Sequence, residues 1–275
     1  MHVPLTLRKL APERSESEQE NPVKTAVVAF IEWFGELGLF CWRVLRALVS
    51  GPFEGRELLR QMDIIGAQSL VLVMLAGAAT GAVMALQTRD SLTRFGAKAM
   101  LPTVIVFALL KETGPIITGL VVSGRVAAGI GSELGSMKVT DQIDAMEASA
   151  VNPYNYLAAT RIIACIIMLP LLTLAADFGG IIIGWIATSL AEPSSLRHFI
   201  NSGFHEVDFG DLIPPTLKTC VYGLIMGVIA CYQGMRTTGG TAGVGRAATS
   251  SVVLSSLCII LADVLLVRLI LVFFP

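Results

Sequence analysis

Hydrophobic residues in this chain gather into five long runs, which cover residues 64–86, 99–130, 157–190, 212–233 and 248–274. A helix needs about 20 mainly apolar residues to cross a hydrocarbon core of about 30 Å. Each run is long enough, so the pattern predicts five membrane-spanning helices. The second run would reach roughly 48 Å at about 1.5 Å per residue. We therefore expect it to project beyond the membrane, to break near Gly114-Pro115, or both.

The first of these runs is rich in small residues: Gly66, Ala67, Gly77, Ala78, Ala79 and Gly81. Small residues let two helix backbones approach closely inside a membrane. This face is therefore predicted to pack against another helix of the chain or against a second copy of it.

The stretch over residues 23–55 differs, because charged residues interrupt its apolar positions at helical spacing. Such an amphipathic segment, flanked by tryptophans, is typical of a helix lying in the membrane interface. A short true span is the alternative, although it would bring four charges into lipid. Residues 1–22 lack the long apolar core of a secretory signal and are predicted to be a disordered cytoplasmic tail.

The composition agrees with a membrane protein, since 54% of the residues are hydrophobic and 15% are charged, against about 25% charged in soluble domains. We predict an all-α integral membrane protein whose membrane domain covers residues 56–275. The net charge of −1 offers no electrostatic reason for nucleic-acid binding. The five cysteines form no metal or redox motif and are expected to serve packing.

The predicted loops and helix ends on one side of the membrane carry more lysine and arginine residues than those on the other side. Cytoplasmic loops carry this excess in membrane proteins. The amino terminus is therefore expected in the cytoplasm and the carboxyl terminus on the outer side. The residues assigned to the cytoplasmic flanks are Arg43, Arg46, Arg56, Arg60, Arg125, Lys138, Arg161, Arg236 and Arg246.

Motifs of catalysis and nucleotide binding are weak. The stretch GGTAGVGRAATS at residues 239–250 places Arg246 and Ala247 where a phosphate-binding loop needs lysine and a hydroxyl residue. We interpret it as a flexible cytoplasmic turn. His198 and His205, in the outer loop, are too few ligands for a metal site. No catalytic residue, metal or cofactor is therefore expected.

Two polar features stand out among the apolar runs. Lys111-Glu112 is either a neutralised structural pair or part of an aqueous or headgroup cavity near a helix break, as at transport sites. Residues 133–150 are predicted to form a polar helix, ended by Asn152-Pro153. This helix is either an interfacial connector or a docking helix for a soluble motor.

These polar features carry a family resemblance. The run KETGPIITGLVVSGRVAAGIGSELGSMKVTDQIDAMEASAVNPYNYL resembles the central block of the MlaE/YrbE family of ABC-transporter permeases. RIIACIIMLPLLT at 161–173, GRAAT at 245–249 and SSLCIILAD at 255–263 are also similar to that family. The resemblance covers the chain from about residue 23 onward. It implies a phospholipid transporter of the Gram-negative inner membrane, with an interfacial amino-terminal helix and five spans.

The resemblance also implies partners. Two permease copies would pair with two ATPase subunits, which bind the ATP, while a ring of MCE-domain protein lies on the periplasmic side. A small STAS-type accessory protein is a further partner that it suggests.

Residue roles follow from the same resemblance. The polar helix would correspond to the family's coupling helix, with ATPase-contacting positions Glu133, Met137, Asp141, Gln142, Asp144, Met146 and Glu147. The lipid cavity would be lined by Val83, Leu86, Gln87, Lys111 and Glu112. The family's usual aromatic residue after that glutamine is absent here, where Thr88 follows. Two other functions stay open on the residues alone: a stand-alone channel or secondary transporter, and a membrane anchor that recruits a soluble complex.

Overall fold

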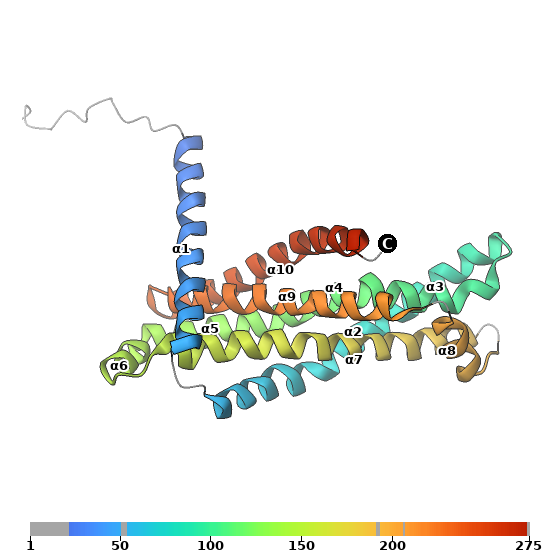
Figure 1. Ribbon diagram of the computed structural model, residues 1–275, viewed down its shortest axis with the longest axis horizontal. Helices are drawn as coiled ribbons and strands as arrows, with labels where there is room; N and C mark the ends of the chain where they lie inside the picture. Colours follow the sequence, from blue (N-terminus) through green and yellow to red (C-terminus); the bar gives the residue numbers. More distant parts are fainter. Residues whose placement is uncertain (1–21, 51–53, 191–192, 206, 274–275) are drawn as a thin grey trace, which may run out of the picture. The chain divides into compact units, whose positions relative to one another are not determined.

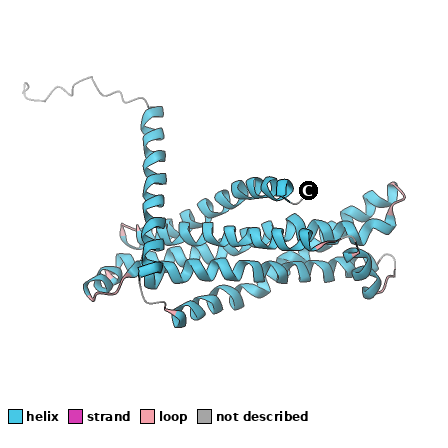
Figure 2. Cartoon of the chain, viewed as in Figure 1, coloured by secondary structure: helices cyan, strands magenta, loops and turns pink. Residues whose placement is uncertain are grey.

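Helices form every element in the described parts of the chain, which are residues 22–50, 54–190, 193–205 and 207–273 of a computed structural model (Figures 1 and 2). No strand occurs in these ranges, which confirms the expectation of an all-α protein. The chain up to Phe40 and the chain from Cys41 onward are two units, and each is described by itself.

Helix α1 (Pro22–Ser50) is the helix that the sequence predicted over residues 23–55. Its placement in the membrane interface stays a prediction, and the predicted tail lies outside the described residues. Arg43, in the part of α1 that belongs to the second unit, donates to the hydroxyl of Tyr154 at 3.2 Å and lies over its ring.

Five helical segments are long and apolar enough to cross a membrane, as predicted. They are α2 (Gly55–Arg94), the segment Lys98–Val139, the segment Tyr154–Ser189, α9 (Phe209–Met235) and α10 (Gly240–Phe273). The segment Lys98–Val139 contains η1 (Lys98–Met100), α3 (Leu101–Ala108), η2 (Leu109–Thr113), α4 (Gly114–Val122), η3 (Ser123–Ala127) and α5 (Ala128–Val139). Tyr154–Ser189 contains η4 (Tyr154–Ala159) and α7 (Thr160–Ser189).

The second span does not break at Gly114-Pro115. Instead η2, a π-helical turn, immediately precedes Gly114, and the helix continues as α4. A proline removes one backbone donor and crowds the preceding turn, and a wider π turn relieves that crowding. The 42 residues of this segment correspond to roughly 60 Å of helix, so it extends beyond the hydrocarbon core as the sequence indicated.

The small-residue face of α2 packs against α7 of the same chain, which decides between the two partners that the sequence left open. A Cβ atom added at Gly77 or Gly81 would collide with the carbonyl oxygen of Ala176 or Gly180. Both helices carry small residues four positions apart, and this spacing lets their backbones touch along one face.

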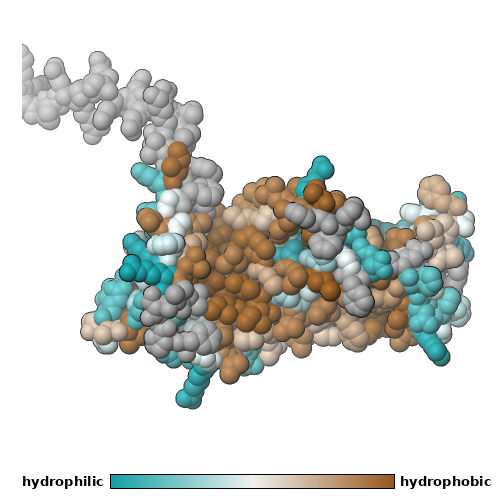
Figure 3. Space-filling view, in the orientation of Figure 1, coloured by the Kyte–Doolittle hydropathy of each residue, from teal (hydrophilic) through white to brown (hydrophobic). Residues whose placement is uncertain are grey.

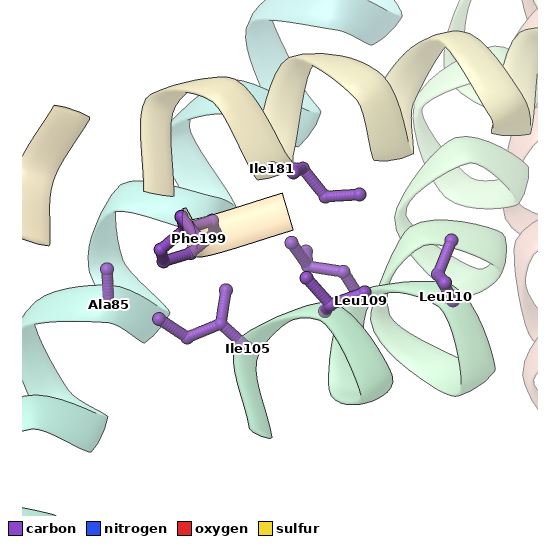
Figure 4. Close-up of a cluster of buried hydrophobic side chains, with 7 residues drawn as sticks. Ala85, Ile105, Leu109, Leu110, Ile181 and Phe199 are labelled. Carbon is purple, nitrogen blue, oxygen red and sulfur yellow. The ribbon is translucent and has the colours of Figure 1, made fainter. Parts of the chain in front are cut away.

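A hydrophobic cluster joins α2, α3, η2, α7 and α8 (Leu196–Phe204) at one end of the bundle (Figure 4). In the close-up, Phe199 and Ile181 lie near Ile105 and Leu109, which come from α3 and η2. The cluster positions η2, whose residues Lys111 and Glu112 directly follow Leu109 and Leu110.

Three connections differ from their sequence-based predictions. Residues 133–150 are not one helix, because Asp141 adopts a positive φ of 57° between α5 and α6 (Gln142–Ala148). The stretch 239–250 is not a flexible turn, since α10 begins at Gly240 and its first turns pack on α5. The connection that carries His198 and His205 contains helix α8, whose Phe199 is buried.

The surface of the molecule reflects this organisation. Hydrophobic side chains cover most of the face of the helix bundle that Figure 3 shows, and hydrophilic ones gather near α6 and at the end that carries α3 and α8. Exposed leucine, isoleucine and valine side chains are frequent along α2 and α10. This distribution is what lipid on the sides and water at the ends require.

Candidate functional site

A cluster of charged side chains lies among the spanning helices and joins η2, α9 and α10. Lys218 of α9 donates to Oε2 of Glu112 and to Oδ1 of Asp263, both at 2.9 Å. The Tyr222 hydroxyl, one turn further along α9, also donates to Asp263. Because three separate helices supply these groups, the cluster ties the second, fourth and fifth spans together.

Two members of this cluster are almost fully buried. Only 1% of the Lys218 side chain and 6% of the Asp263 side chain are exposed, against 45% for Glu112. An ionised group inside a membrane protein is costly unless it is paired, so Lys218 and Asp263 depend on each other. Glu112 is the member of the cluster that reaches open space.

A second ion pair lies beside the first. Lys111 donates to Oδ1 of Asp211 at 2.8 Å, and its ammonium group also lies 4.4 Å from the centre of the Phe107 ring. Asp211 and Lys218 are seven residues apart on α9 and so share one face of that helix. The neighbours Lys111 and Glu112 therefore both bind α9 and not each other.

These side chains border a cavity of about 310 Å³ between η2, α9 and α10. Lys111, Glu112 and Lys218 form its charged edge, while its other walls are apolar. The apolar lining residues are Phe107, Ala108, Pro215, Val267, Ile270 and Leu271. A cavity with a charged edge and apolar walls suits a molecule that has a polar head and an apolar tail.

The three α2 residues predicted to line a lipid cavity together with Lys111 and Glu112 do not line this one. Val83 and Leu86 are 52% and 55% exposed, and Gln87 is also exposed. No α2 residue lines the cavity in the described part of the chain. The structure thus brings Lys111 and Glu112 together with α9 and α10, while Val83, Leu86 and Gln87 form an outward-facing stripe on α2.

The other predicted site is the segment of α5 and α6. Asp141, Gln142, Asp144 and Glu147 are exposed, while Met137 and Met146 are half-buried. Ile143 is buried and anchors α6. An ion pair of 2.7 Å between Lys138 and Asp144 spans the bend at Asp141. The result is a short helix that presents carboxylates at one end of the molecule.

Glu133, the first of the predicted coupling residues, links this region to the next span. Its carboxylate pairs with the guanidinium of Arg161 at 2.9 Å, and only 2% of the Arg161 side chain is exposed. Arg161 also donates to the carbonyl oxygen of Leu157, inside η4. The ion pair therefore connects α5 directly to the start of α7.

Sequence reasoning missed Asp211, Lys218 and Tyr222 as members of the site. The available signal was an ionisable residue inside an apolar run, which is rare unless it has a partner or a function. Asp263 showed this signal in the fifth run. The partners could not be assigned, because 106 residues separate Glu112 from Lys218 and 45 separate Lys218 from Asp263.

Comparison with known proteins identifies the family. The family model described as permease MlaE matches residues 58–269. The chain belongs to the MlaE permease family. A probable ABC transporter permease protein of Rickettsia felis is 35% identical over 249 residues, which cover 90% of this chain and 96% of that protein. One from Synechocystis is 32% identical over 221 residues, which cover 80% and 84%.

A plant protein is also similar to this MlaE-family permease. The Arabidopsis thaliana protein named trigalactosyldiacylglycerol 1, chloroplastic, is 30% identical over 264 residues, which cover 92% of this chain and 75% of that protein. The chain is thus an ABC transporter permease that crosses the membrane several times. A permease of this class implies a partner ATPase.

Proposed function

We propose that this MlaE-family permease moves phospholipid between the inner and outer membranes of a Gram-negative cell and that a separate ATPase drives it. The observation that carries the proposal is the cavity beside the charged cluster. Its apolar walls suit acyl chains, and the ammonium group of Lys111, whose side chain is 29% exposed beside Asp211, suits a headgroup phosphate. Support also comes from the plant relative, whose name refers to a glycerolipid.

The volume of the cavity limits how much of a phospholipid one chain can enclose. About 310 Å³ is at the lower end of the range for small-ligand sites, so one chain holds only part of a phospholipid. A second copy would complete the site, and the exposed stripe of Val83, Leu86 and Gln87 is a surface that such a copy could cover. We therefore propose a homodimer with the lipid between its subunits.

Coupling to the ATPase would use α5 and α6. The segment Lys98–Val139 carries Lys111 and Glu112 about a third of the way along it and Glu133 about 30 Å further on. When ATP draws two ATPase subunits together, α6 would follow, and the movement would pass through α5 to η2. The Glu133–Arg161 pair would carry it to α7 as well. Both movements would reduce the space around the lipid.

The proposed setting follows from this arrangement. The end that carries α6 would face the cytoplasm, where the ATPase hydrolyses ATP, and α10 would end on the periplasmic side. There a ring of MCE-domain protein would take up or deliver the lipid. A STAS-type protein would accompany the ATPase.

One purification tests the proposal. The tagged full-length chain would be isolated in mild detergent from its own cells, and its proteins and lipids would be measured together by mass spectrometry. We expect an ATPase, an MCE-domain protein and phospholipid at a constant ratio to the permease. A permease that carries lipid but no ATPase would overturn the proposal in favour of a stand-alone transporter or an anchor.

A pair of variants tests the cavity itself. Ala108→Phe adds a ring to a residue that lines the cavity, and we expect it to lower the bound phospholipid several-fold while the ATPase still co-purifies. Val104→Phe adds a ring one turn earlier, at a 36% exposed residue that does not line the cavity. Equal lipid in both variants would show that the lipid binds elsewhere.

A further inference from the structure

A second cavity, of about 160 Å³, lies at the end of the molecule where α2 ends and α3 begins. Arg89 and Leu92 of α2 line it, together with Lys98, Thr188 at the end of α7, and His198 and Phe199 of α8. It shares no lining residue with the cavity beside the charged cluster.

The side chains that line this second cavity are either basic or uncharged. Arg89 and His198 come from α2 and α8 and both line it, and its described lining contains no aspartate or glutamate. The planar guanidinium of arginine matches the oxygens of a phosphate in a bidentate way. The lining therefore favours an anionic group, and Arg89 is the residue best suited to bind it.

The walls of this cavity are held in place by contacts outside it. Trp185 donates from Nε1 to the carbonyl oxygen of Ser194 at 3.1 Å, and Thr103 donates to the carbonyl oxygen of Ser202 at 2.9 Å. Phe199, 2% exposed, anchors α8 in the hydrophobic cluster. A preorganised wall lowers the entropic cost of binding a ligand.

Apolar groups complete the lining and narrow the ligand class. Leu92, Leu101, Pro102 and Phe199 lie beside the basic residues, so part of the ligand is apolar. The cavity also lies at the ends of the first three spans, near Arg94, Lys98 and Ser189.

We infer that this second cavity binds the phosphate group of an anionic amphiphile, through Arg89 and His198. The chemistry of the site recognises a phosphate, which a lipid headgroup or free inorganic phosphate could supply. This inference does not rest on lipid transport, because a binding site at this end of the bundle would exist in a channel or an anchor as well.

The test compares two double variants of the full chain, purified in detergent in its native complex. Arg89→Gln with His198→Gln removes the two proposed ligands. Arg94→Gln with Arg197→Gln changes two exposed residues of the same helices, α2 and α8, that do not line the cavity. Both leave the α9–α10 cavity unchanged, so lipid held there contributes equally.

Binding would be measured by titrating each protein with short-chain phosphatidylglycerol, with short-chain diacylglycerol and with inorganic phosphate. We expect phosphatidylglycerol to bind the wild type and the Arg94/Arg197 variant alike, and at least fivefold more weakly to the Arg89/His198 variant. Diacylglycerol, which lacks the phosphate, should not distinguish the proteins. Inorganic phosphate that binds as tightly and shows the same loss would identify free phosphate as the ligand.

Two outcomes would overturn the inference: equal affinity of both double variants for every phosphate-bearing probe, or an equal loss in the Arg94/Arg197 variant. The second would mean that only the overall charge of this end matters. Either outcome would leave the result of the Ala108→Phe purification untouched, so this inference and the proposed function fail separately.

Discussion

At the scale of single residues, the buried Lys218 is held by two carboxylates that come from other helices. Its ammonium lies 2.9 Å from an oxygen of Glu112 and 2.9 Å from an oxygen of Asp263. The burial of Lys218 is what makes these contacts matter for stability, because ion pairs at the surface contribute at most about 1 kcal/mol. Breaking a buried pair by removing one partner costs about 3 to 5 kcal/mol, since the other charge is left without a counter-charge.

We therefore expect Lys218→Met to lower the melting temperature in detergent by on the order of 10 °C. The double variant Lys218→Met, Asp263→Asn should recover at least half of the loss, because it removes the stranded carboxylate while the amide can still accept from Tyr222. Differential scanning fluorimetry would measure both. A single variant that melts like the wild type would show that the cluster does not stabilise the bundle.

At the scale of elements, the contact between α2 and α7 depends on glycine. The backbones of Gly77 and Gly81 touch α7 so closely that even a methyl group has no room. The opposing atoms belong to the backbone of α7 and cannot rotate away. The helices must move apart when a side chain is added, which costs packing along the whole contact.

Gly81→Ala is expected to lower the melting temperature by several degrees, corresponding to about 1 to 3 kcal/mol of strain. Gly129→Ala is the matched control, because a Cβ atom there meets nothing within 4 Å. Alanine favours the helix over glycine by roughly 0.5 to 1 kcal/mol, so this control should melt at the wild-type temperature or slightly above. If both variants melt alike, the close approach of α2 and α7 is not what limits stability.

The elements that local pattern predicted well are those whose apolar length alone defines them, which are the five spans. The hydrophobic pattern did not predict the structure at the ends of these spans. The start of α10 contains several glycines and so resembled a turn, yet it packs on α5 and is helical. Residues 133–150 resembled one helix, and no local signal showed that Asp141 would take a left-handed conformation.

At the scale of the whole molecule, the helical segment Lys98–Val139 joins the charged cluster to the bend that precedes α6. Residues about a third of the way along it border the cavity, and α5 at its end leads to the exposed carboxylates of α6. In the proposed mechanism, this segment would pass a displacement of α6 along its length to the cavity. In that mechanism, the Glu133–Arg161 pair would carry the movement to α7 as well.

Glu147→Lys reverses an exposed charge on α6, and we expect it to leave the melting temperature unchanged while it lowers the co-purifying ATPase at least tenfold. Reversing a charge at a complementary interface costs several kcal/mol of binding free energy. A loss of about 1.4 kcal/mol already weakens the affinity tenfold. Asp90→Lys, the same change at an exposed residue of α2, should bind the ATPase normally. Normal ATPase binding by Glu147→Lys would instead place the interface elsewhere.

The sequence by itself determined that this chain crosses the membrane with five helices, because apolar length is a local property that the bilayer thickness selects. It also singled out Lys111 and Glu112, because charge inside an apolar run is visible without a fold. Only the tertiary structure decided that Glu112 and Asp263 both bind Lys218, that the glycines of α2 meet α7, and that Val83, Leu86 and Gln87 do not line the cavity between α9 and α10. Those outcomes depend on which helix faces meet, and contacts between segments many residues apart set those faces.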